Sequence, residues 1–341
     1  MSTQDLSLGK GKNAVNVNLT GFKGGVKREQ LQTEQEKSIF DALDTNKDGV
    51  IDEKEMQQLK SELLGAAGKK DAENLSKGEA KDFLKAKGLK KIKKEDLFKF
   101  IQNISQSSEN IKECATDPET GNILIEYNDG TQETIRPDKT SARQKNADGK
   151  TTTTQFNTNN EPVEESVVEE NGKDGTATVY QLDAEGNPVK DKDGNYVPAK
   201  TTVITDEGQT TTVTDLKDGV PTQKTVTTDD GKTTDVTTYE NGIPKEQTIT
   251  KEGSKTIVQY DEKGQPKEAV ETQGEYTVKN FTYVDGQARE MSRVENKGQD
   301  TEKTTEFTYN EDGTVLEQIS ELGGNKKTAR LTKDGKPQAE E

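Results

Sequence analysis

The regular spacing of glycine in the C-terminal part of the chain is the feature that most restricts how it can fold. Two interleaved sets of glycines mark turns, each set repeating about every 22 residues: Gly219, Gly242, Gly264, Gly286, Gly313 and Gly335, and between them Gly208, Gly231, Gly253, Gly274 and Gly298. Two turns in each repeat leave strands of about seven to nine residues, as in an antiparallel β-meander. Threonine and valine fill these intervals, and both residue types favour pleated strands.

A tyrosine stands just before several of these turns, at Tyr239, Tyr260, Tyr283 and Tyr309. Segments such as Tyr-Glu-Asn-Gly-Ile-Pro-Lys at 239–245 and Tyr-Asp-Glu-Lys-Gly-Gln-Pro-Lys at 260–267 resemble YD repeats of the Rhs type. They also resemble the tyrosine–glycine hairpin repeats of the MORN-like kind. The resemblance implies repetitive β structure, arranged as an open ribbon or a solenoid-like sheet.

Composition indicates that this β structure is thin. Only 26% of the chain is hydrophobic and 5% aromatic, while 33% is charged. An ordinary globular domain is roughly 45–50% apolar when glycine is counted, so a large compact core is not expected. The prediction is a single-layer sheet, and the alternative is that these polar strands stay partly disordered. No apolar stretch approaches the roughly 20 residues of a membrane-spanning helix, so none is expected.

Charge divides the chain at about residue 113. Residues 1–112 carry 21 Lys+Arg and 18 Asp+Glu, a balance of +3. The whole-chain totals of 48 and 64 then leave 27 basic and 46 acidic residues for 113–341, a balance of −19. An acidic surface repels phosphate backbones, so nucleic-acid binding by the C-terminal part is not expected.

The N-terminal part has helical patterns around one metal-binding motif. Thr33 and Glu36 form a capping box before a helix whose apolar face carries Ile39, Phe40 and Leu43. The next twelve residues, 44–55, read Asp-Thr-Asn-Lys-Asp-Gly-Val-Ile-Asp-Glu-Lys-Glu, which is the pattern of a calcium loop. A second amphipathic helix follows, with Met56, Leu59 and Leu63 on its apolar face and Gly65 predicted to end it.

This motif resembles an EF-hand, and the spacing has a chemical reason. Calcium takes six to eight oxygen ligands at about 2.3–2.6 Å, so the chain must wrap the ion and present oxygens at alternate positions. Gly49 permits the sharp bend at the sixth position. Asp52 would act directly or through a water, Val50 through its carbonyl, and Glu55 through both carboxylate oxygens. Six residues are therefore predicted to hold calcium: Asp44, Asn46, Asp48, Val50, Asp52 and Glu55.

Three other segments carry the short Asx-x-Asp-Gly motif, at 146–149, 191–194 and 310–313. Aligned on their glycines, they have no acidic residue at the first or the twelfth loop position. Such segments are simple turns, and of the four only 44–55 has the acids that a calcium cage needs.

EF-hands usually come in pairs joined by a short ladder, and a second, degenerate hand is predicted over residues 85–96. Ser76 with Glu79 would cap its first helix, which carries Phe83 and Leu84, and a later helix carries Leu97, Phe98, Ile101 and Ile104. With Ile92 at the ladder position, lysines stand where the carboxylates belong. These lysines form either a solvated face or a basic dock for an acidic partner, the chain's own acidic half included.

The residue inventory argues against an enzyme. Histidine is absent, which removes imidazole acid–base catalysis and histidine metal sites. Cys114 is the single cysteine, and it is interpreted as an incidental thiol. No phosphate loop or nucleophile elbow is present.

The sequence thus predicts an α+β chain in separate parts: a flexible tail (1–29), an all-α EF-hand pair (30–112) and an extended repetitive antiparallel β-meander (113–341). Its expected role is non-enzymatic calcium binding coupled to an acidic β arm that serves in interaction or structure. The alternative is a secreted, toxin-like effector in which calcium is only structural. The partner would be a protein or a cell surface. No signal peptide is visible, so the expectation is a cytoplasmic protein or export by a leaderless route.

Overall fold

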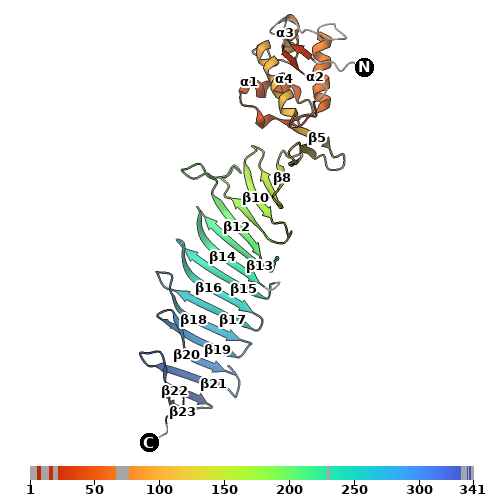
Figure 1. Cartoon of the computed structure of the whole chain (residues 1–341). Helices are drawn as coiled ribbons and strands as arrows, with labels where there is room; N and C mark the ends of the chain where they lie inside the picture. Colours follow the sequence, from red (N-terminus) through yellow and green to blue (C-terminus); the bar gives the residue numbers. More distant parts are fainter. Residues whose placement is uncertain are drawn as a thin grey trace. The chain divides into compact units, whose positions relative to one another are not determined.

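The computed structural model describes residues 6–8, 15–17, 22–66, 77–228, 231–331, 336 and 338 of the 341-residue chain (Figure 1). The chain divides into two compact units. The first comprises Met1–Val167 with Leu182–Pro188, and the second comprises Val168–Gln181 with Val189–Glu341. Helices followed by antiparallel strands confirm the predicted α+β class. Among the described helices, none is long and apolar enough to cross a membrane.

Four helices and a 3₁₀ turn form the N-terminal part of the first unit: η2 (Arg28–Gln30), α1 (Glu34–Leu43), α2 (Glu53–Ala66), α3 (Lys77–Ala86) and α4 (Lys94–Ser108). The predicted capping box starts α1, because Thr33 Oγ1 accepts from the Glu36 amide at 3.1 Å and Glu36 accepts from the Thr33 amide. The predicted apolar faces meet in one helical core, in which Phe40, Leu63 and Ile101 are fully buried.

β4 (Val50–Ile51) lies between α1 and α2, and the other strands of this part of the chain lie before and after the helices. They are β1 (Leu6–Leu8), β2 (Val15–Val17), β3 (Val26–Lys27), β5 (Ile111–Thr116), β6 (Ile123–Tyr127), β7 (Gln132–Ile135), β8 (Ser141–Ala147), β9 (Lys150–Phe156) and β10 (Pro162–Val168), whose last residue belongs to the second unit. β1 pairs with β2 and β3 with β4, while β5 to β9 pair in sequence order. A second apolar cluster joins Val50 to Ile111, Ile123, Ile125 and Ile135.

The second unit is an open antiparallel meander in which each strand pairs with its sequence neighbours (Figure 1). Its strands are β11 (Gly175–Tyr180), β12 (Pro198–Thr205), β13 (Thr210–Lys217), β14 (Val220–Thr228), β15 (Thr233–Glu240), β16 (Ile243–Lys251), β17 (Ser254–Tyr260), β18 (Pro266–Gln273), β19 (Thr277–Val284), β20 (Gln287–Glu295), β21 (Lys303–Tyr309), β22 (Val315–Leu322) and β23 (Asn325–Arg330). Within its described residues, the buried apolar side chains are Val258 and Ala269. The sheet is therefore a single layer, as the composition predicts.

The predicted turn glycines within the described residues all have positive φ, as tight turns require. Gly335 lies outside the described residues. The register also shifts once in every second hairpin, and Tyr180, Tyr239, Tyr260 and Tyr309 each lie at such a shift. Each shift leaves one extra residue on the partner strand. In four of these hairpins a proline stands immediately before the extra residue (Pro198, Pro221, Pro244 and Pro266). Proline has no amide to donate and is tolerated at such bulges.

Three expectations for the helical part were wrong. Residues 22–29 were assigned to a flexible tail, whereas Phe22 and Val26 are buried and β3 pairs with β4. The other tail residues are either in β1 and β2 or outside the described residues. Gly65 does not end α2, which continues to Ala66.

The second hand is the third correction, because residues 85–96 do not form a calcium-type loop. Residues 85–86, the first two positions of the predicted loop, still belong to α3, whereas α1 ends at Leu43, before the first position of 44–55. Residues 87–93 connect α3 to α4. Ile92 is not in a ladder; its amide donates to the Leu89 carbonyl, and its side chain packs against the helical core. Ser76, the first half of the capping box proposed for α3, lies outside the described residues.

Candidate metal centre

The predicted calcium loop, residues 44–55, connects α1 to α2. α1 ends where the Asp44 amide donates to the Phe40 carbonyl at 2.8 Å. The chain then bends at Gly49, whose φ of +89° is the left-handed conformation that glycine adopts without strain. After the two residues of β4, α2 begins at Glu53. The loop thus has the helix–loop–helix surroundings that its sequence predicts.

The first half of the loop is organised by its own side chains. Asp44 Oδ2 accepts from the Gly49 amide at 3.0 Å, which ties the first loop position to the sixth. Asn46 Oδ1 accepts from the Asp48 amide at 3.0 Å, and Asp48 Oδ1 accepts from the Val50 amide at 2.8 Å. These hydrogen bonds from loop amides to side-chain oxygens fix the positions of three predicted ligands, Asp44, Asn46 and Asp48.

Glu55 connects the two ends of the loop. Its Oε1 accepts from the Thr45 amide at 2.6 Å and from the Asn46 amide at 3.3 Å. At the other end, Asp52 Oδ1 accepts from the Glu55 amide at 2.8 Å, as a cap for the first turn of α2. Glu55 is only 6% exposed, so the twelfth loop position is buried beside the second and third.

The six predicted ligands lie on one loop, yet their acidic side chains do not converge on a single point. Within the described residues, no group of three or more Asp, Glu, Cys or His side chains is gathered closely enough to hold a metal ion. The carboxylates instead accept hydrogen bonds from the loop amides. Val50 lies in β4, where its backbone pairs with Lys27.

Three observations nevertheless fit a hard divalent cation. Asp44 is 7% exposed, and its buried Oδ1 has no hydrogen-bond donor. Burial raises the pKa of Asp48, and the charges of Asp44 and Asp52 add to the rise. Burial also raises the pKa of Glu55. A bound cation would stabilise buried carboxylates of this loop and satisfy the free oxygen, and carboxylate oxygens are the ligands that calcium prefers.

The strand that pairs with the loop comes from the N-terminal segment, where a second EF-hand loop was expected. In the β3–β4 ladder, Val26 pairs with Ile51 and Lys27 pairs with Val50. Gly24 and Gly25 bring this segment in, both with positive φ. A Cβ on Gly25 would lie 2.7 Å from Ile111 Cδ1, so the end of that side chain would have to shift, and the φ of +79° strains any other residue. The adjacent glycines before Val26 are the sequence signal for this close approach.

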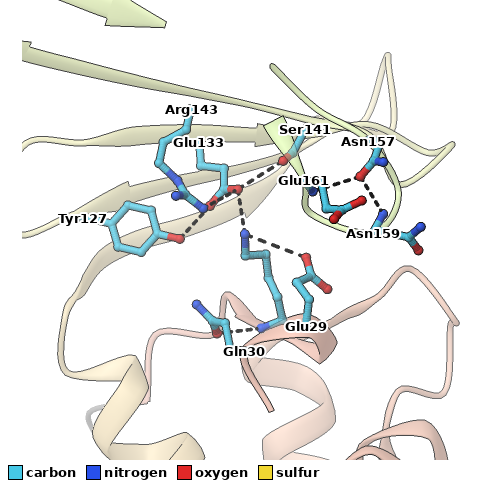
Figure 2. Close-up of polar contacts among 10 residues, drawn as sticks. Glu29, Gln30, Tyr127, Glu133, Ser141, Arg143, Asn157, Asn159 and Glu161 are labelled. Carbon is cyan, nitrogen blue, oxygen red and sulfur yellow. Dashed lines mark hydrogen bonds and ion pairs between the residues drawn. The ribbon is translucent and has the colours of Figure 1, made fainter. Parts of the chain in front are cut away.

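A buried polar cluster surrounds Glu133 of β7, and Figure 2 shows Tyr127, Ser141 and Arg143 beside this carboxylate. Lys27 belongs to the same cluster. Its Nζ lies 2.7 Å from Glu133 Oε1, and the two side chains are 1% and 0% exposed. The Tyr127 hydroxyl donates to Glu133 Oε2 at 2.7 Å, and the Ser141 hydroxyl donates to Oε1 at 3.2 Å. Arg143 lies on the outer side, 3.4 Å from the same carboxylate.

This cluster is satisfied well enough to keep Glu133 ionised. Burial alone would raise the pKa of Glu133, but the Lys27 charge and hydrogen bonds from Lys27 and Tyr127 hold that pKa below its ordinary value. The side chain of Val50 meanwhile packs in the apolar cluster formed by β5–β7. The loop therefore contacts the sheet in two ways. Val50, its seventh residue, packs on the sheet directly, and Lys27, which pairs with Val50, contacts Glu133.

Cys114 lies at the edge of the same apolar cluster. Burial raises the pKa of its thiol to about 12, with smaller contributions from the charges of Asp52 and Asp48. A thiol that stays protonated is a poor nucleophile. This agrees with the interpretation of Cys114 as an incidental cysteine.

Comparison with known proteins supports the EF-hand. The EF hand family matches residues 37–60, which include the whole predicted loop and parts of both flanking helices. No curated protein matches the chain. None of the comparisons supports a similarity to Rhs-type YD repeats or MORN-like repeats, so that resemblance is withdrawn.

Solved structures similar to this chain include a porin-like protein from Bacteroides uniformis (11% identity, 58% of this chain and 91% of the other, TM-score 0.16). A putative 6-phosphogluconolactonase from the same organism has 8% identity over 64% of this chain and 90% of the other, with a TM-score of 0.16. Hsv2 from Kluyveromyces lactis has 10% identity over 62% and 85%, with a TM-score of 0.17. Similarities this low carry no inference about fold or function.

Proposed function

We propose that this is a non-enzymatic calcium-binding protein with one working EF-hand loop, whose acidic β arm serves in interaction or structure. The observation that carries the proposal is the loop itself: an EF hand match over 37–60 in which the buried Asp44 Oδ1 has no donor. Asp44, Asn46, Asp48, Asp52 and Glu55 would supply side-chain oxygens, and Val50 its carbonyl.

The non-enzymatic part of the proposal rests on chemistry. The chain has no histidine, and burial leaves the Cys114 thiol protonated at neutral pH. The acidic residues of the second unit lie on a single-layer sheet, and within its described residues none of them is buried. A thin acidic arm with two accessible faces suits contact with a protein or cell-surface partner better than catalysis.

Calorimetric titration of the full chain with calcium tests the metal site. One calcium per chain is expected for the wild type and none for Glu55→Gln. Glu53→Gln is the matched control, because Glu53 stands two residues earlier, outside the ligating positions, and is exposed. No heat and no thermal stabilisation by calcium in the wild type would reject the proposal.

The dissociation constant separates two roles. A value near ~10⁻⁷–10⁻⁵ M would let the loop respond to calcium signals inside a cell. A value near ~10⁻⁴–10⁻³ M would make calcium a structural ion of an exported protein. Among the described residues, the strand paired with the loop is β3 rather than a second EF-hand loop, so we propose simple, non-cooperative binding.

A further inference from the structure

The connector between α3 and α4 builds a surface of its own, distant in sequence from the calcium loop. α3 ends in a Schellman motif: the Leu89 amide donates to the Leu84 carbonyl at 2.8 Å, and the Gly88 amide donates to the Lys85 carbonyl at 3.2 Å. Gly88 supplies the left-handed residue that this motif requires, with φ of +75°. The motif turns the chain back, so that Leu89 and Leu84 line the same cavity.

This cavity is an open groove of about 570 Å³ with an apolar floor. Leu84 is buried, and Leu89 and Ile92 are half-buried side chains packed against the helical core. The floor is thus continuous with the helical core. Two large apolar side chains nevertheless remain partly in contact with solvent at its surface.

Lysines surround that floor. Lys81, Lys85, Lys90 and Lys93 line the groove, and none of them makes an ion pair with the described residues. Lys94 also lines it and pairs with Glu95 at 3.1 Å. Residues 85–96 hold six lysines against two acids, a local balance of +4 in a chain whose net charge is −16. Uncompensated like charges repel each other and attract an anionic partner.

We propose that this groove is a docking site for an acidic peptide segment that carries a large apolar anchor residue. The apolar floor accepts the anchor, and the lysine rim pairs with carboxylates on either side of it. A peptide fits better than a membrane because the apolar residues lie at the bottom of a concavity, whereas insertion into lipid needs them to project. It also fits better than nucleic acid, because phosphates would leave the apolar floor uncovered.

The test uses the full-length protein and a fluorescein-labelled 14-residue peptide of glutamate with leucine at helical spacing. We expect saturable binding, measured by fluorescence anisotropy at low ionic strength, and no binding of a matched lysine–leucine peptide. The triple variant Lys81→Gln/Lys90→Gln/Lys93→Gln should weaken the binding at least tenfold. The matched control Lys23→Gln/Lys54→Gln/Lys99→Gln removes three exposed lysines elsewhere in the helical part and should leave it unchanged.

The apolar floor is tested separately with Leu89→Ala, which should weaken binding severalfold while circular dichroism shows intact helices. If the two triple lysine variants weaken peptide binding equally, or if Leu89→Ala does not weaken it, the peptide is bound only by general charge attraction. Either result would overturn the proposal. Stronger binding to phosphatidylserine vesicles or to a DNA duplex would overturn it in favour of those ligands. Peptide binding is measured both with calcium and with a chelator, and it is expected under both conditions. A failure of the calcium site would therefore not be mistaken for a failure of the peptide site.

Discussion

Lys27 and Glu133 lie 106 residues apart in sequence and form a 2.7 Å ion pair from which water is almost wholly excluded. Lys27 belongs to β3, the strand paired with the calcium loop, and Glu133 belongs to β7 of the sheet. The pair therefore joins the helix–loop–helix to the sheet within the first unit. Two hydroxyl donors, from Tyr127 and Ser141, complete the carboxylate's hydrogen bonds.

Removing both partners of this pair should cost less stability than the sum of the two single removals. Lys27→Met leaves a buried carboxylate, and Glu133→Gln leaves a buried ammonium; breaking a buried pair this way typically costs about 3–5 kcal/mol. The double variant Lys27→Met/Glu133→Gln leaves no uncompensated charge, so its loss should be clearly smaller than the sum. Urea unfolding of the four proteins measures this, and simple additivity would show that the two side chains act independently.

Calcium affinity should depend on the same pair, although neither residue belongs to the loop. Lys27 pairs with Val50 through the backbone, and Val50 packs on β5–β7. Glu133→Gln should therefore weaken calcium binding severalfold, measured by calorimetry. Glu126→Gln breaks the exposed Lys112–Glu126 pair of the same sheet and serves as the control. Equal affinity in both variants would mean that the loop and the sheet are energetically independent.

Acid should remove the contribution of Glu133 in a defined window. Its pKa is lowered in the folded chain, so its contribution is fully present above the ordinary value of 4.5 and is lost as pH falls through the lower folded pKa. The stability difference between wild type and Glu133→Gln should be constant from pH 7 to about 5 and shrink below that. Urea titrations at a series of pH values give this difference, and a constant value down to pH 3 would contradict the assignment.

Protons should compete with calcium at a higher pH than ordinary carboxylates would allow. The pKa values of Asp48 and Glu55 are raised above 3.8 and 4.5, chiefly by burial. Without calcium, the folded chain binds protons at these two carboxylates more tightly than the unfolded chain does, because their pKa values are raised by folding. Protonation at low pH therefore stabilises the calcium-free folded chain. The calcium affinity should consequently fall on acidification before pH 4.5 is reached. Calorimetry at falling pH checks this, with proton release on binding as the second readout.

Two glycine-to-alanine substitutions should change the stability of the fold in opposite directions. Gly25→Ala places a Cβ 2.7 Å from Ile111 at a φ of +79°, which should cost about 1–3 kcal/mol. Gly65→Ala lies inside α2 with nothing within 4 Å of the new Cβ, so it should stabilise by about 0.5–1 kcal/mol. Thermal unfolding distinguishes them; a neutral Gly25→Ala would show that the N-terminal segment is not held against β5.

Local patterns predicted most of the secondary structure, since glycine spacing and apolar periodicity are local properties. The capping box at Thr33, the apolar faces of the helices and the meander are all of this kind. The partner of β4 could not be found this way, because Val26–Lys27 is too short to show a strand period. Nor could Glu133, which looks like any polar residue of a half-exposed strand until Lys27 is placed against it. The expectation of paired EF-hands pointed to Ile92, but Gly88 ends α3 in a turn that leaves no strand there.

The sequential pairing of β11 to β23 has a consequence for how the second unit forms and comes apart. From β12 onward, every hydrogen-bonded neighbour of a strand lies one short connection away in the chain, so the entropy cost of closing each loop is small. Such an array can fold and unfold one hairpin at a time. The interaction energy between neighbouring hairpins then determines how far local unfolding spreads along the sheet. Lengthening or shortening the arm by whole hairpins would therefore change its reach while leaving the remaining strands with the neighbours they already have.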